Sequence, residues 1–181
     1  MKNIAIGITG AVSSAAMPSF IMHLRKELDC RVTVMVSKNA TRFVTPYALR
    51  IYSGNEVFTD TYEVGENVLV PHIKLTQDAD ITVIMPASSN VIAKAAHGIS
   101  DDLISTAIVA SASPVLFVPS MNERMWFNPV VQANVAKLKE YGYHVLEPEN
   151  GKTVGGEDVY GAMASLKSVI NLLGNFLSIN N

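Results

Sequence analysis

Short apolar runs alternate with helical spacings along the first part of the chain. Asn3 to Ile8 is an apolar run, and beyond it apolar residues recur at one-helix-face spacing between Met17 and Leu28. A valine-rich run at 31–36 predicts a second strand, and 46–53 predicts a short helix. Strand, turn and helix in this order are typical of a parallel α/β sheet.

The same alternation continues toward the carboxyl end. Ile81 to Met85 and Pro114 to Val118 are apolar runs of buried-strand type, 128–141 is helical, and 143–146 predicts a last short strand. The final helix carries an apolar stripe that ends near Leu177. We expect one α/β domain over residues 1–181, a three-layer, doubly wound parallel sheet of Rossmann-like or flavodoxin-like type.

Two segments lack a period. The stretch 54–70 is polar and acidic, and 150–160 combines glycine with charge, so we expect a polar loop and a flexible loop there.

Composition excludes several partners. The chain has 14 basic and 16 acidic residues, a net charge of -2, without a basic run, so we expect no nucleic acid or membrane partner. The apolar start is interrupted by Gly7 and Gly10, well short of a membrane span, and the single Cys30 cannot form an internal disulfide. We therefore expect a cytoplasmic protein.

Polar turns follow three of the predicted strands. Gly10 opens a turn with two serine hydroxyls ahead of a helix, where a phosphate could bind, although the dinucleotide fingerprint is absent and Gly10 alone is well explained as a turn residue. Pro86 to Asn90 and Pro119 to Asn122 end two later strands. Neighbouring parallel strands would bring such turns together at the edge where open α/β sheets bind ligands.

Two of these turns belong to long motifs. PASSNVIAKAAHGISDDLIS and PSMNERMW resemble the signatures of the homo-oligomeric flavin-containing cysteine decarboxylases, and the likeness covers roughly Ile4 to Pro148. The resemblance implies FMN as cofactor and oxidative decarboxylation of a cysteine to an enethiol. It also implies self-association to trimers, grouped into dodecamers, with the flavin near the trimer contact.

The resemblance implies catalytic roles for His72 as a base and Asn122 as a neutral donor to the substrate carboxylate. Without the resemblance, a lone histidine is more often structural than catalytic, and Asn122 is equally well explained as a turn or cap residue. No metal site is expected. From the turns and the resemblance together, we expect the flavin to contact Gly10, Ser13, Ser14, Ser37, Phe43, Pro86, Ala87, Ser88, Asn90, Asp101, Ser105 and Met121.

The chain departs from the family near its carboxyl end. The branch that acts on phosphopantothenoylcysteine carries a proton-donating cysteine, and Gly155 stands at the matching position here. The departure favours the peptidyl-cysteine decarboxylases of lantibiotic and related peptide biosynthesis, whose partner is a precursor peptide with a C-terminal cysteine. The alternatives are a phosphopantothenoylcysteine decarboxylase of coenzyme A biosynthesis and a non-catalytic FMN-binding regulatory subunit.

Overall fold

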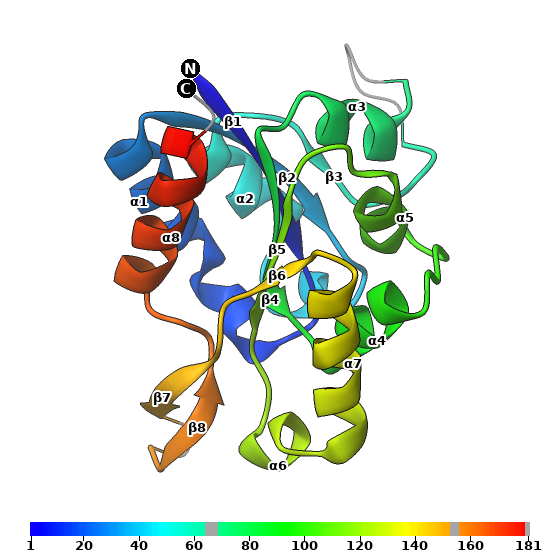
Figure 1. The fold of residues 1–181 in the computed structure, drawn as a ribbon. Helices are drawn as coiled ribbons and strands as arrows, with labels where there is room; N and C mark the ends of the chain where they lie inside the picture. Colours follow the sequence, from blue (N-terminus) through cyan, green and yellow to red (C-terminus); the bar gives the residue numbers. More distant parts are fainter. Residues whose placement is uncertain (64–68, 153–155, 180–181) are drawn as a thin grey trace.

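A parallel sheet forms the centre of the molecule (Figure 1). The computed structural model describes residues 1–63, 69–152 and 156–179. Within these residues the strand order is β3-β2-β1-β4-β5-β6, so the chain winds outward in both directions from β1. In chain order the strands are β1 (Lys2–Ile8), β2 (Cys30–Val36), β3 (Val57–Phe58), β4 (Ile81–Ala87), β5 (Val115–Pro119) and β6 (His144–Val145).

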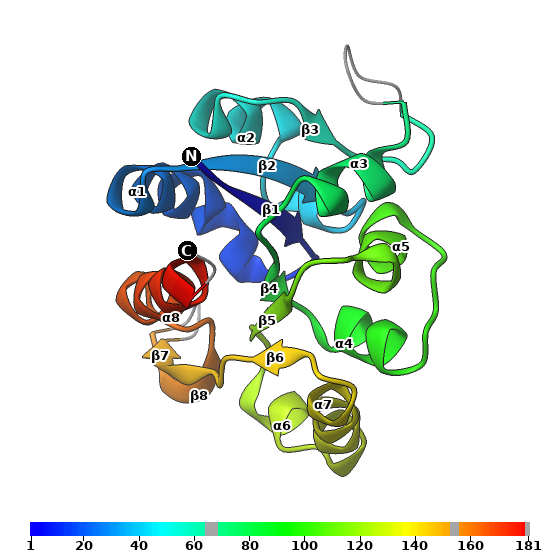
Figure 2. The ribbon, with the colours of Figure 1, turned by 45° about the horizontal axis from the view of Figure 1, so that its top comes forward.

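Helices cover both faces of the sheet (Figure 2). On one face lie α1 (Met17–Leu28), α2 (Pro46–Ser53) and α8 (Leu166–Ile179). On the other lie α3 (Pro71–Gln77), α4 (Ser89–Ala96), α5 (Leu103–Ala110) and α7 (Pro129–Glu140). The 3₁₀ turns η1 (Val12–Ala16) and η2 (Ala40–Arg42) and the short α6 (Glu123–Trp126) follow strand ends.

The period-two alternation of β1 separates the two apolar cores. Ile4, Ile6 and Ile8 are fully buried in the core beneath α1 and α8, whereas Ala5 belongs to the core beneath α4 and α5. Because both faces of a parallel strand are covered, the strand is apolar almost throughout. The predicted three-layer, doubly wound α/β fold is confirmed.

Two predictions of loop structure are wrong. The polar stretch after α2 contains β3, and the expected flexible loop at 150–160 contains an antiparallel hairpin of β7 (Glu149–Lys152) and β8 (Asp158–Ala162). Glycine here permits close approach, since a Cβ at Gly151 would collide with the Cβ of Ala162 on the facing strand. Residues 153–155, including Gly155, lie outside the described residues.

Across the described part of the chain, every helix is too short or too polar to cross a lipid bilayer.

Candidate functional site

A cavity of about 990 Å³ opens where the strands of the sheet end. Its walls come from the turns that follow β1, β2, β4 and β5, at residues 9–13, 36–39, 88–91 and 120–122. The volume lies at the upper end of the range for small-molecule sites. The place is where doubly wound sheets bind ligands, since the turns on either side of the central strand diverge there.

Thr9 joins two of these turns. Its hydroxyl donates to the carbonyl oxygen of Pro86 (2.7 Å) and accepts from the backbone N–H of Ser88 (2.9 Å). The hydroxyl of Ser13 reaches the turn after β5, donating to Oγ of Ser120 (2.8 Å). Hydrogen bonds between loops therefore hold the rim of the cavity in one arrangement.

Gly10 lets the turn after β1 lie against the turn after β2. A Cβ at this position would stand 2.6 Å from the Cβ of Asn39, so a side chain at position 10 would force the two turns apart. Beside them, Oγ of Ser37 accepts from the N–H of Ala40 (3.3 Å), and Lys38 and the half-exposed Phe43 also line the cavity. This wall offers hydroxyls, a cation and an aromatic ring, a donor set that fits a phosphate group carried by a flat ring system.

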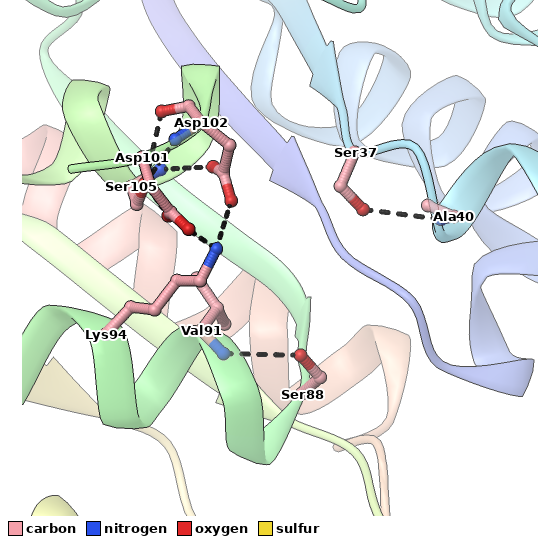
Figure 3. A network of polar contacts seen from close by, with 8 residues as sticks. All are labelled: Ser37, Ala40, Ser88, Val91, Lys94, Asp101, Asp102 and Ser105. Carbon is pink, nitrogen blue, oxygen red and sulfur yellow. Dashed lines mark hydrogen bonds and ion pairs between the residues drawn. The ribbon is translucent and has the colours of Figure 1, made fainter. Parts of the chain in front are cut away.

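Lys94 forms an ion-pair network on the opposite wall (Figure 3). Its ammonium lies 2.6 Å from Oδ1 of Asp101 and 2.7 Å from Oδ2 of Asp102. Asp102 also caps α5 by accepting from the N–H of Ser105 (2.8 Å), so the network ties α4 to α5.

The network keeps its charges across neutral pH. Burial disfavours the ammonium of Lys94, but the two carboxylates outweigh burial and raise its pKa above the ordinary 10.5. The hydrogen bond from Lys94 lowers the pKa of Asp101 below 3.8. One cation with two carboxylates leaves a net negative wall, so Lys94 is not available to bind a substrate anion.

Asn122 follows β5 and serves as the N-cap of α6. Its Oδ1 accepts from the N–H of Arg124 (2.8 Å), which leaves its amide NH₂ as a neutral donor in a residue that is exposed to the cavity. Met121 lines the cavity beside it.

The cavity brings together most of the residues expected around the flavin. Those that line it are Gly10, Ser13, Ser37, Phe43, Ser88, Asn90, Asp101 and Met121, with Asn122 from the catalytic pair. Ser88 also caps α4 by accepting from the N–H of Val91 (3.4 Å).

Four of the expected flavin contacts do not line the cavity. The Ser14 hydroxyl is buried and donates to the carbonyl oxygen of Thr9 (2.7 Å), and the Ser105 hydroxyl belongs to the buried capping box of α5. Pro86 and Ala87 are the buried last residues of β4. These residues hold the turns in place, and direct contact of any of the four with the flavin stays a prediction.

His72 is not among the residues that line the cavity. It lies in the first turn of α3, which packs against α5. Its Nδ1 is buried and has no hydrogen-bond partner among the described residues. In its own chain, the described structure therefore does not bring His72 together with Asn122 at the cavity.

Other lining residues escaped the sequence reasoning. Thr9 directly precedes Gly10 and carries no signal of its own in the sequence. Lys94 does carry one, because it is the only lysine or arginine in the apolar stretch 86–122. Lys152 and Gly161, on the hairpin, line the cavity from a segment read as a loop. The hydrophobic pattern of that segment gives no sign that it belongs to the site.

Known proteins match the chain throughout. The profile of the Flavoprotein family matches residues 1–178. The coenzyme A biosynthesis bifunctional protein CoaBC of Borreliella burgdorferi is 35% identical over 174 residues, 96% of this chain and 44% of that protein. The chain thus spans less than half the length of that relative. A probable phosphopantothenoylcysteine decarboxylase of Streptococcus mutans is 30% identical over 93% of this chain and 95% of its own length.

Solved structures share the fold over nearly the whole chain. A PPC decarboxylase mutant complexed with pantothenoylaminoethenethiol superposes with a TM-score of 0.84 at 25% identity, covering 98% of each chain. The FMN-dependent cysteine decarboxylase SpaF superposes with a TM-score of 0.78 at 29% identity, covering 97% of this chain and 98% of its own. Together with the profile match and the Streptococcus relative, these likenesses establish that the chain belongs to the Flavoprotein family, as its turn motifs predict.

Proposed function

We propose that the protein is an FMN-dependent enzyme that decarboxylates the cysteine unit of phosphopantothenoylcysteine in coenzyme A biosynthesis. The observation that carries the proposal is the likeness to the Streptococcus decarboxylase, because it extends over almost the full length of both chains. The Borreliella relative, which belongs to the same pathway, supports the same substrate. Coenzyme A biosynthesis thereby takes precedence over the peptide substrate that the sequence alone favoured.

The cavity suits FMN. Gly10 and Ser13 form a side-chain-poor cradle, while Ser37 and Lys38 offer the hydroxyl and the positive charge that a phosphate needs. The bound flavin supplies the acceptor for a hydride from Cβ of the cysteine unit. The chain's own residues have to bind the carboxylate, remove the thiol proton and orient Cβ.

Asn122 is proposed to bind the substrate carboxylate. With Oδ1 held by the N–H of Arg124, the side chain presents an uncharged NH₂ donor. A cation at this place would stabilise the carboxylate more than the departing CO₂ and would slow the reaction. The C–CO₂ bond then breaks, and its electron pair becomes the double bond of an enethiolate.

His72 is proposed to take the thiol proton in a neighbouring subunit. His72 does not line the cavity of its own chain, and its buried Nδ1 lacks a partner among the described residues. An assembly in which α3 of one copy approaches the cavity of the next would bring the imidazole to the substrate. This arrangement agrees with the expected self-association to trimers.

A peptide ending in cysteine is the second candidate substrate. The only cysteine of the sequence is Cys30, which is buried in β2, and glycine stands at position 155. No thiol is therefore available to protonate the enethiolate, as in decarboxylases that stop at that product. The likeness to the cysteine decarboxylase SpaF is compatible with either substrate.

Mass spectrometry of the products tests the proposal. The yellow, FMN-loaded protein is incubated separately with phosphopantothenoylcysteine and with a peptide ending in cysteine. Loss of CO₂ from the former, with or without two hydrogen atoms, supports the proposal, and turnover of the peptide alone selects the second candidate. Bound FMN without either activity would indicate a regulatory subunit, and a colourless protein that FMN cannot reconstitute would refute the assignment.

A further inference from the structure

The β7–β8 hairpin is docked on the turn that carries Asn122. The backbone N–H of Met121 donates to the carbonyl oxygen of Gly161 in β8 (3.0 Å). A second contact lies next to it, where the rings of Phe127 and Tyr160 stack with centroids 5.5 Å apart and planes 23° from parallel. Both contacts join the hairpin to the segment between β5 and α7.

Gly161 makes this docking possible for two independent reasons. Its φ of +117° lies in the region that side-chain-bearing residues rarely adopt. A Cβ at this position would also stand 2.5 Å from the carbonyl oxygen of Met121 and 3.5 Å from the carbonyl carbon of Asn122. Since the nearest of these atoms belong to the backbone, no side-chain rotation could relieve the clash.

We propose that Gly161 is a positioning residue that fixes Asn122 for catalysis, an inference that rests on the proposed role of Asn122. The backbone of Asn122 is held between Gly161 on one side and α6 on the other, where its own Oδ1 accepts from the N–H of Arg124. Once backbone and oxygen are both fixed, the position of the NH₂ group is fixed with them, in a residue that lines the same cavity as Gly161. The hairpin thus sets the aim of the carboxylate-binding group.

Comparison of Gly161→Ala with Gly156→Ala tests the proposal. Gly156 also has a positive φ, +87°, and belongs to the same hairpin connection, but a Cβ there would meet no atom of the described residues within 4 Å. Both variants place a side chain at a positive φ, and only Gly161→Ala pushes on the Asn122 turn. The FMN-loaded proteins are compared by amide hydrogen exchange at Met121, flavin content, kcat and KM, at a temperature well below unfolding.

For Gly161→Ala we expect loss of protection at the Met121 amide, an unchanged flavin content and a fall of about 100-fold in kcat, the cost of a displacement near 1 Å. Gly156→Ala should match the wild type in all four measurements. Wild-type protection and turnover in Gly161→Ala, or equal losses in both variants, would overturn the proposal.

Two further comparisons distinguish failure of this proposal from a failure to fold and from failure of the proposed function. If Gly161→Ala does not fold, Tyr160→Ala removes the stacking contact without backbone strain; it should lower kcat and Met121 protection, with Tyr160→Phe restoring both. Unchanged values in Tyr160→Ala would then count against the proposal. If the wild type turns over no cysteine substrate, the proposed function fails, whereas the exchange difference between the two glycine variants still reports on the docking.

Discussion

Asn122 divides one amide between folding and chemistry. Its oxygen caps α6, and its NH₂ group is the donor proposed for the substrate carboxylate. Aspartate is as good an N-cap as asparagine, but it replaces the donor by a second, negatively charged acceptor. The two tasks can therefore be separated by a single substitution.

Asn122→Asp should fold, bind FMN and lose activity. We expect kcat/KM to fall by about 100-fold or more, as when a transition-state donor is removed, and like-charge repulsion of the carboxylate adds to the loss. Steady-state kinetics and thermal unfolding measure the two properties. The matched control is Asn128→Asp, since Asn128 caps α7 in the same way (2.9 Å to Val130 N) but does not line the cavity; a comparable loss there would contradict the role of Asn122.

Cys30 should be unreactive in the folded protein. Burial raises the pKa of its thiol to about 11, so almost no thiolate exists at pH 8. Iodoacetamide at that pH should change neither the mass nor the activity, while the unfolded chain should gain one adduct. Inactivation of the native enzyme would show that a thiol takes part after all.

Lys152 offers a test of the substrate class. Lys94 is neutralised by two carboxylates, whereas Lys152 on the hairpin meets Asp158 only at 3.8 Å, with both side chains exposed. It is free to turn toward a substrate phosphate. For Lys152→Gln we expect KM to rise about 10-fold for phosphopantothenoylcysteine and to stay unchanged for the substrate without phosphate. Equal changes for both substrates would mean that Lys152 does not read the phosphate.

At the scale of the elements, Glu149 fastens the hairpin to α8. Its carboxylate accepts from the hydroxyl of Ser168 and from the backbone N–H of Ser165 (3.1 Å), and these hydrogen bonds lower its pKa below the ordinary 4.5. A carboxyl whose pKa is depressed by folding stabilises the folded state fully above its unfolded pKa. That contribution disappears as the pH falls from 4.5 through the lower, folded value.

The stability difference between wild type and Glu149→Gln should follow the same course. We expect about 1 kcal/mol or less at pH 7, because the side chain is only partly buried, and a difference that shrinks as the pH falls below 4.5. Urea unfolding across this range gives the comparison. Glu140→Gln, at the exposed end of α7, is the control and should show little difference at any pH. A difference for Glu149→Gln that grows toward acid would contradict this account.

Elements with a clear hydrophobic period could be predicted from the sequence, whereas elements that depend on close approach between two backbone segments could not. The run Pro46–Ser53 was predicted as a helix with the bounds that α2 has, because its cap and its apolar spacing are local signals. The hairpin was missed because Gly151 and Gly161 are indistinguishable in sequence from loop glycines, and their reason lies in the opposite backbone. Whether a glycine serves a flexible loop or a close backbone contact depends on residues that are distant in the sequence.

The site shows the same division. Turns at the ends of parallel strands could be grouped in advance, because parallel strands end at one edge. Which serine hydroxyl faces the cavity could not be predicted, since Ser13 lines the cavity and Ser14, next to it, donates to the carbonyl oxygen of Thr9. The position of His72 depends on how α3 packs against α5, which no local pattern records.

At the scale of the whole molecule, an active site shared between subunits predicts complementation. If His72 of one copy serves the cavity of another, His72→Asn and Asn122→Asp should each be inactive alone, and oligomers assembled from both variants should regain part of the activity. Some mixed contacts would then combine an intact His72 with an intact Asn122.

Co-expression with two different tags, followed by tandem purification, isolates the mixed oligomers for assay. Light scattering on the wild type measures the size of the oligomer. An active monomer, or mixed oligomers as inactive as their parents, would exclude the shared site.

The central place of β1 has a consequence for synthesis. Ile4 pairs with Val32 on one side and with Ile81 on the other, so β1 leaves the ribosome before both of its neighbours and acquires the second only after β4 has followed. Until then an apolar strand with an open edge is available to other nascent chains. Yield in overexpression should therefore depend on translation speed before β4 and on chaperones that shield this edge, more than on the stability of the finished protein.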